Sequence, residues 1–177
     1  MSEHPLQKII EPFKLVSTRA LVDGVVAFSA LSRLREELSG VSPEVDVAHV
    51  ELAFQRDPQG YVLASGSIRA DGGVVCQRCL DIVPISLDVP VSWAFIVNEE
   101  TSCDVPRAYD VIALEEESVS LYDLVEDELI LALPPIPMHA EGQCSAPGYV
   151  SPNEEQIERS EEKKNPFEVL SEIRKKR

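Results

Sequence analysis

The sequence has no apolar run long enough to cross a lipid bilayer. The longest run, residues 129–138, contains three prolines, whereas a membrane-spanning helix needs about 20 apolar residues. The first ten residues, MSEHPLQKII, also lack the basic start and apolar centre of a signal peptide. We therefore expect a cytoplasmic protein with no membrane partner, in which cysteines stay reduced and do not form disulfides.

Positive charge is scarce. The 177 residues include 16 Lys and Arg against 31 Asp and Glu, which gives a formal net charge of -15. Such a surface repels phosphate and suits a basic partner better than nucleic acid. The exception is the carboxyl end, where four consecutive cations could contact RNA phosphate: Arg174, Lys175, Lys176 and Arg177. The same four residues would equally suit solubility or the negative end of a helix dipole.

The common catalytic signatures are missing as well. There is no phosphate-binding glycine-rich loop, no nucleophile elbow and no His-Glu-x-x-His pair. We therefore expect no enzyme active site and no small-molecule substrate. The acidic residues of the predicted 119–133 helix, Asp123, Glu126 and Asp127, are expected to face solvent and to form a surface for a basic partner.

Hydrophobic periodicity predicts several strands in the first two thirds of the chain. Residues 13–28 read as short extended pieces, and 44–56 and 61–70 read as the two strands of a hairpin. The clearest strand is 85–97, where apolar and polar residues alternate. Pro90 lies within it, and proline lacks the N–H needed for strand pairing, so we expect an edge or a bulge there.

Two of these strands are expected to be irregular, and two helices accompany them. The apolar parity changes near His49, which indicates a bulge or bend, and the segment 71–73 (Asp-Gly-Gly) should break or bulge its strand. Ser29 could cap a short helix that ends at Gly40. A second helix over 119–133 should be capped by Ser120 and ended by two prolines.

Together these elements predict an α+β fold. We expect a curved antiparallel sheet or small open barrel over residues 1–150, with the 119–133 helix packed on it. Residues 151–164 read as a charged linker, and 165–177 as a C-terminal helix with a basic end. That helix is too short to be stable alone in water, so it should dock on something.

Cysteine is rare, with four residues, but two of them form the motif Cys76-Gln-Arg-Cys79. A redox motif would need a helix starting at the first cysteine, and the residues that follow look extended. Two thiolates on a tight turn can bind one metal ion, and His139 and Cys144 offer the other two ligands of a tetrahedral site. This spacing favours structural zinc. A redox pair and simple buried cysteines remain alternatives at this point.

Four segments are informative in combination. They are CQRCL (76–80), VEDELILALPPIPMH (125–139), Cys144 and NPFEVL (165–170). In this order they closely resemble the YceD family, the large ribosomal RNA subunit accumulation proteins of bacteria and plastids. The resemblance covers about residues 10–177. It implies a non-enzymatic role in accumulation of 23S ribosomal RNA, and it favours a zinc-type site because relatives carry further cysteines just after the helix.

The resemblance and the charge together predict a biogenesis factor for the large ribosomal subunit. The simplest physical route is that the acidic protein holds a basic large-subunit protein, or assembles with one on precursor 23S RNA. A second hypothesis is direct RNA binding through Arg78 and residues 174–177. A third is a zinc-dependent hydrolase at the Cys/His site, which would need an open coordination position and a nearby base.

Overall fold

The computed structural model describes residues 4–41, 46–97 and 105–144. All of them belong to one compact unit, Met1–Cys144. The predicted linker at 151–164, the predicted helix at 165–177 and the four basic residues at its end lie outside the described residues. The proposed domain boundaries therefore stay predictions. Within the described part of the chain, no helix is both long and apolar enough to cross a membrane.

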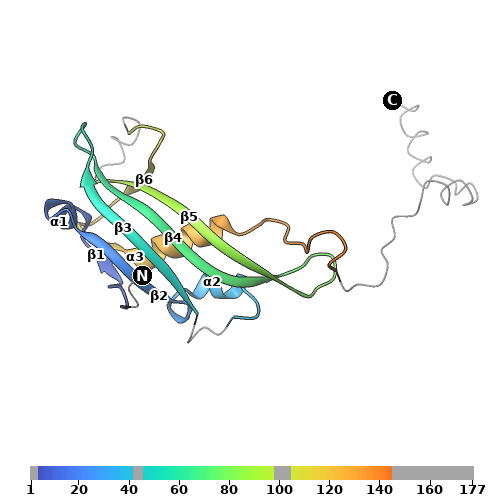
Figure 1. Cartoon of the computed structure of the whole chain (residues 1–177). Coiled ribbons are helices and arrows are strands. Elements are labelled where there is room, and N and C mark those ends of the chain that lie inside the picture. Colours follow the sequence, from blue (N-terminus) through green and yellow to red (C-terminus); the bar gives the residue numbers. More distant parts are fainter. Residues whose placement is uncertain (1–3, 42–45, 98–104, 145–177) are drawn as a thin grey trace, which may run out of the picture. The chain divides into compact units, whose positions relative to one another are not determined.

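The body of the unit is a curved, open five-stranded sheet in the order β2-β3-β4-β5-β6 (Figure 1). Neighbouring strands are antiparallel except β5 and β6, which run parallel. The strands are β2 (Leu21–Ala27), β3 (Val47–Arg56), β4 (Val62–Val75), β5 (Ile82–Ile96) and β6 (Asp110–Ala113). A separate two-stranded sheet pairs β1 (Ile9–Ile10) with β7 (Val119–Ser120).

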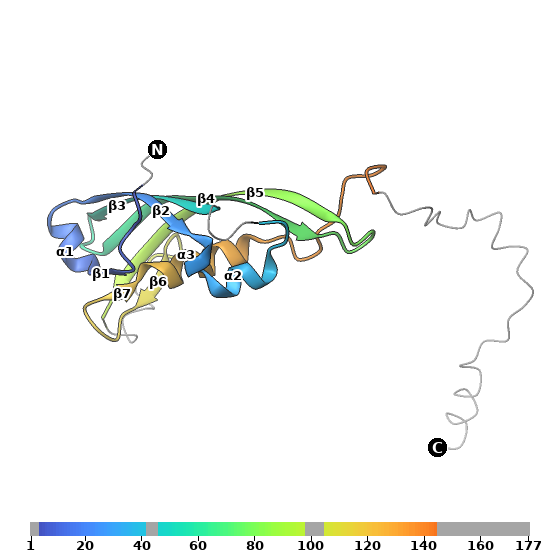
Figure 2. The same cartoon turned by 90° about the horizontal axis from the view of Figure 1, so that it is seen from below.

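The helices cover one face of the large sheet (Figure 2). They are α1 (Pro12–Ser17), α2 (Ser32–Glu37) and α3 (Leu121–Ala132), with a 3₁₀ turn, η1 (Phe28–Ala30), ahead of α2. The inner sheet face and the helices form one hydrophobic core that includes Trp93, Phe28 and Leu129. The predicted α+β class, with a mostly antiparallel open sheet and a packed helix, is confirmed.

The strands are more regular than their sequences indicate. From Ala48 to Arg56, β3 pairs with β4 one residue to one, so of the bulge or bend predicted near His49 the bulge is wrong. The strand β4 also continues through Gly73 to Val75 instead of breaking. The glycine is used for close packing, because a Cβ at Gly73 would lie 2.6 Å from the carbonyl oxygen of Ser39.

The amino-terminal third differs from prediction in two places. Residues expected to be extended include α1, which begins at Pro12, a residue whose fixed φ suits the first turn of a helix. Ser29 lies in η1 and does not cap α2, whose N-cap position is Leu31. The second difference leaves α2 without a side-chain cap of its own, and a residue from α3 takes that role, as described below.

The long strand β5 and the long helix α3 agree with the predictions made from their sequences. Among the described residues β6 pairs only with Trp93–Ile96 of β5, so the part of β5 around Pro90 lies at the edge of the described sheet, as predicted. The hydroxyl of Ser120 accepts a hydrogen bond from the N–H of Asp123 (3.3 Å), and α3 ends at Ala132 before the two prolines. Both features confirm local sequence signals.

Gly66 is a position where the packing leaves no room for a side chain. It lies on β4 opposite Leu52 of β3, and a Cβ there would be 1.8 Å from the carbonyl oxygen of Glu51. We expect Gly66→Ala to lower the free energy of unfolding by about 2–3 kcal/mol, because the backbone of β3 would have to move. Urea denaturation measures this change.

The neighbouring substitution Ser65→Ala is the matched control for Gly66→Ala. Ser65 is half-buried and has room for its own Cβ, so the control should change the free energy of unfolding by less than about 0.5 kcal/mol. Equal stability of the two variants would show that the sheet tolerates a side chain at position 66.

Candidate metal centre

The turn that links β4 to β5, residues 76–81, forms a compact knuckle. The N–H of Cys76 donates to the carbonyl of Asp81, and the N–H of Leu80 donates to the carbonyl of Cys76, both at 2.9 Å. Leu80 has a φ of +65° and an exposed side chain. That left-handed conformation is more usual for glycine. The tight turn brings the thiols of Cys76 and Cys79 within 4.8 Å of one another.

The second half of the centre arrives on the segment that follows α3, drawn in orange beside the end of the β4–β5 hairpin in Figures 1 and 2. The N–H of Gln77 donates to the carbonyl of Pro137 (2.9 Å). The Nε2 atom of His139 lies 3.2 Å from the carbonyl oxygen of Ile82. These contacts fasten the segment to the knuckle and direct His139 and Cys144 toward the two thiols.

The side chains of Cys76, Cys79, His139 and Cys144 form one cluster, as the sequence spacing predicted. Their ligand atoms all lie within 4.8 Å of one another. The two sulfur atoms of Cys76 and Cys144 are 3.7 Å apart, and the sulfur of Cys79 is 3.3 Å from Nδ1 of His139. Tetrahedral zinc, with bonds of about 2.3 Å to sulfur and 2.0 Å to nitrogen, separates its ligand atoms by roughly 3.5–3.8 Å. The donor set therefore fits Zn²⁺.

Groups around the four ligands hold them in place. The carbonyl of Ile82 beside Nε2 favours the tautomer of His139 that leaves Nδ1 free for a metal. Nε of Arg78 donates to the sulfur of Cys144 (2.9 Å), and its Nη2 donates to the carbonyl of His139 (3.1 Å). Three thiolates around Zn²⁺ carry one excess negative charge, which this guanidinium would balance.

The local environment shifts the pKa values of the two knuckle thiols, Cys76 and Cys79, in opposite directions. Burial disfavours the thiolate of Cys76, but backbone hydrogen bonds from Cys79, His139 and Arg78 outweigh it and lower its pKa to about 5. Burial, together with the neighbouring thiols of Cys144 and Cys76, raises the pKa of Cys79 to about 11. A divalent cation would stabilise all the thiolates together, and this is the chemical reason for such a site to bind one.

Arg78, which the sequence offered as an RNA contact, thus has a role within the knuckle. The hydrogen bond that it donates to Cys144 raises the pKa of its guanidinium further. Three of its hydrogen bonds end on the segment after α3, at Cys144 and at the carbonyls of His139 and Ala140. Arg78 therefore acts as a positioning residue for two of the ligands.

The predicted acidic partner surface on α3 is only partly as expected. Asp123 and Asp127 are exposed, but Glu126 is 5% exposed, so the prediction that it faces solvent is wrong. Its carboxylate accepts hydrogen bonds from the N–H groups of Arg33 (2.7 Å) and Leu34 (3.1 Å) at the start of α2. Glu126 is buried because α2 packs against α3 at this point, which the helix sequence alone does not reveal.

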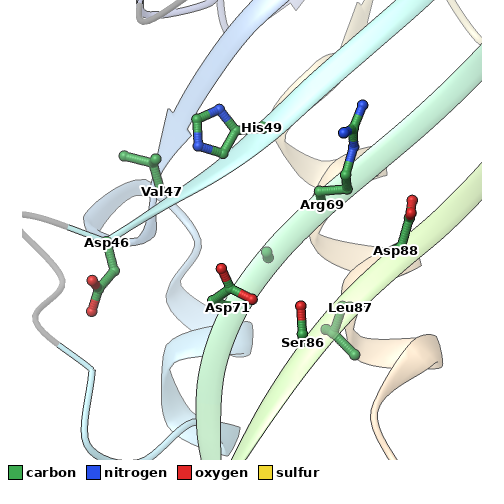
Figure 3. A pocket seen from close by; sticks show the side chains of 9 residues that line it. Asp46, Val47, His49, Arg69, Asp71, Ser86, Leu87 and Asp88 are labelled. Atoms are coloured by element: carbon green, nitrogen blue, oxygen red, sulfur yellow. The ribbon is translucent and has the colours of Figure 1, made fainter. Parts of the chain in front are cut away.

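A polar hollow that sequence reasoning missed lies on the sheet (Figure 3). Its volume is about 390 Å³, and Asp71 and Asp88 with Arg69 and His49 are among the residues that line it. The side chain of Arg69 also forms an ion pair with Glu51 (3.3 Å). The residues come from β3, β4 and β5. The polar positions that alternate with core positions along each strand were the available signal.

Comparison with known proteins bears on the whole chain. Residues 64–174, which include all four candidate ligands, match the family model "Large ribosomal RNA subunit accumulation protein YceD". The chain is 33% identical over 181 residues to the protein of that name from Haemophilus influenzae, across 99% of this chain and 100% of the relative. No solved structure matches it. The chain belongs to the YceD family of large ribosomal RNA subunit accumulation proteins.

Proposed function

We propose that this protein is a non-enzymatic biogenesis factor that supports accumulation of 23S RNA in the large ribosomal subunit. The observation that carries the proposal is the similarity of nearly the whole chain to a relative named for accumulation of the large ribosomal RNA subunit. A match of this extent includes the sheet, the knuckle and the helix together, which favours a common role as well as a common fold.

The charge of the unit favours a basic protein as the direct partner. Residues 1–144 contain nine Lys and Arg against 24 Asp and Glu. Exposed carboxylates lie on two surfaces, at Asp71 and Asp88 in the polar hollow and at Asp123 on α3, where the neighbouring Asp127 is paired with Arg33. A basic large-subunit protein, free or already on precursor RNA, fits such surfaces, because opposite charges speed encounter and align the two molecules.

The metal centre fits a structural role in this proposal. Three thiols and one imidazole from the chain could fill all four positions of a tetrahedral ion. A hydrolytic zinc keeps one position for water, so the geometry supports a structural knuckle over a hydrolase. When bound, zinc would join the end of the β4–β5 hairpin to the segment after α3.

Affinity purification of the tagged full-length protein tests the proposal. We expect large-subunit precursor RNA or a basic large-subunit protein to be retained at low salt and released as salt rises, since surface charge attraction is screened. Asp71→Asn combined with Asp88→Asn should reduce retention severalfold if the polar hollow takes part.

The matched control removes the same number of negative charges outside the polar hollow. Asp110 and Glu141 are also exposed, and neither lines the hollow, so Asp110→Asn combined with Glu141→Gln should leave retention close to wild type. Retention of no large-subunit component, even at low salt, would refute the proposed function. Equal retention by both double variants would exclude the hollow and leave the α3 surface.

A further inference from the structure

The end of the sheet away from the knuckle contains a hollow lined by two arginines. Its volume is about 680 Å³, and the residues that line it are Val16, Ser17, Arg19, Leu21, Ala53, Phe54, Gln55 and Arg56. No acidic residue is in this set. Acidic residues outnumber basic ones by 24 to nine in residues 1–144, so a hollow with two cations and no anion contrasts with the rest of the surface.

Backbone pairing brings the two arginines together. Leu21 pairs with Ala53, and the N–H of Phe54 donates to the carbonyl of Ala20 (2.9 Å). Arg19, just before Ala20, therefore lies beside the end of β3, where Arg56 is the last residue. Both arginine side chains are exposed, so their guanidinium groups can reach a ligand in the hollow.

In the described part of the chain, no carboxylate neutralises either of these two guanidinium groups. Among the described residues, neither arginine forms an ion pair, whereas Arg33 and Arg69 both do. Nη1 of Arg56 donates to the carbonyl of Gly60 (2.8 Å), which holds that side chain in place. A guanidinium has five N–H donors, so most donors of the pair are available to a ligand.

The backbone at Arg19 adds a second, independent observation. The last turn of α1 is closed by hydrogen bonds from the N–H of Arg19 to Val16 and from the N–H of Ala20 to Leu15. In this helix ending the residue in the left-handed conformation is usually glycine, yet here it is Arg19, with a φ of +49°. Backbone strain of this kind clusters at functional sites, and the exposed guanidinium is the feature that glycine would lack.

We propose that Arg19 and Arg56 bind a phosphate of the RNA backbone. Guanidinium forks match the geometry of phosphate oxygens and form charge-assisted hydrogen bonds with them. Leu21, 80% exposed at the hollow, offers an apolar surface to a sugar or base. Because the surrounding acidic surface repels phosphate, RNA would be held at this place and in few orientations. The inference rests on the proposed function and assigns it an RNA contact.

A binding experiment with two charge-matched double variants tests this site. Arg19→Gly removes one charge and introduces the residue that best tolerates a positive φ, so it should not weaken the fold. Arg56→Gln removes the second charge of the hollow. The control combines Arg35→Gln with Arg107→Gln, two exposed arginines that do not line the hollow. Thermal unfolding of each variant confirms that it is folded.

The probe is a labelled single-stranded fragment of 23S RNA, and fluorescence anisotropy measures its affinity for the full-length chain at low salt. We expect the hollow variant to bind about tenfold more weakly. Its plot of log affinity against log salt should be shallower by about 0.7, the value for one lost phosphate contact on a single strand. The control should remain within about twofold of wild type.

Several results would overturn the inference. The first is that the wild-type chain does not bind the RNA probe, and the second is that both double variants lose affinity equally. Displacement of RNA by equimolar inorganic phosphate would assign the site to a free phosphate, and tighter binding of poly-glutamate through the same arginines would assign it to an acidic polypeptide. If large-subunit components are still retained in the purification experiment, only the RNA site fails; if none are retained, the proposed function fails.

Discussion

Cys79→Ala should abolish zinc binding and release the segment after α3 from the end of the β4–β5 hairpin. We expect about one zinc per wild-type chain, since four suitable ligands meet at one point. In the variant His139 loses the sulfur that lies 3.3 Å from its Nδ1, and three ligands hold the ion far more weakly. Metal analysis of both purified proteins measures the difference.

The structural effect should be large and local. Structural zinc in small domains contributes about 10–16 kcal/mol of binding free energy, which becomes folding free energy. Here the main core lies between the helices and the inner sheet face, so it should persist. Hydrogen exchange should accelerate in residues 74–82 and 134–144 and change little in β2 and β3.

Cys103→Ser provides the matched control, because Cys103 lies outside both segments that supply the candidate ligands, 76–79 and 139–144. This variant should keep its zinc and its exchange pattern. The metal-centre prediction fails if wild-type protein, purified without chelators from zinc-containing medium, carries no metal and the Cys79→Ala variant exchanges no faster than wild type. It also fails if Cys79→Ala retains a full equivalent of zinc.

Glu126→Ala should lower the free energy of unfolding by about 3 kcal/mol, a decrease of roughly 6–12 °C in Tm. The N-cap position of α2 is Leu31, which has no side-chain acceptor. The carboxylate of Glu126 supplies the missing acceptor. It accepts hydrogen bonds from the N–H groups of Arg33 and Leu34, and it forms an ion pair with the Arg33 side chain. Alanine would leave two helix N–H groups without that acceptor.

Two further variants separate the buried contact from surface charge. Asp127→Asn removes the neighbouring ion pair between Asp127 and Arg33, in which both side chains are 54% exposed. This substitution should lower the free energy of unfolding by less than about 1 kcal/mol. The stability loss of Glu126→Gln should lie between those of Glu126→Ala and Asp127→Asn, because the glutamine amide oxygen still accepts one hydrogen bond. Thermal and urea unfolding measure all three, and equal losses for Glu126→Ala and Asp127→Asn would contradict the capping role.

Local patterns predicted a good part of this molecule. Alternation along 85–97 identified β5, and Ser120 with the following apolar stripe identified α3, because both signals depend on residues a few positions apart. The metal cluster was also predictable. Cysteine and histidine are few, so the number of ways to assemble four ligands was small, and the family resemblance supported one of them.

Long-range packing decided the features that local patterns could not. The partners of Glu126 lie more than 90 residues away in the sequence, so its burial depends on how α2 meets α3. The uninterrupted pairing of β4 through Gly73 depends on the backbone of Ser39 and on β5. In both cases the free energy comes from contacts between segments, and these outweigh the local preference for solvent or for a turn.

The chain's own composition and spacing were sufficient for its acidic character, its α+β class, its family resemblance and the four candidate metal ligands, since each is carried by residue identity and local order. Which charges are free was decided by the fold. It buries Glu126, places Arg78 against Cys144, and leaves Arg19 and Arg56 unpaired among the described residues. The availability of a charge depends on the neighbours that folding brings within a few ångströms, and those neighbours are distant in the sequence.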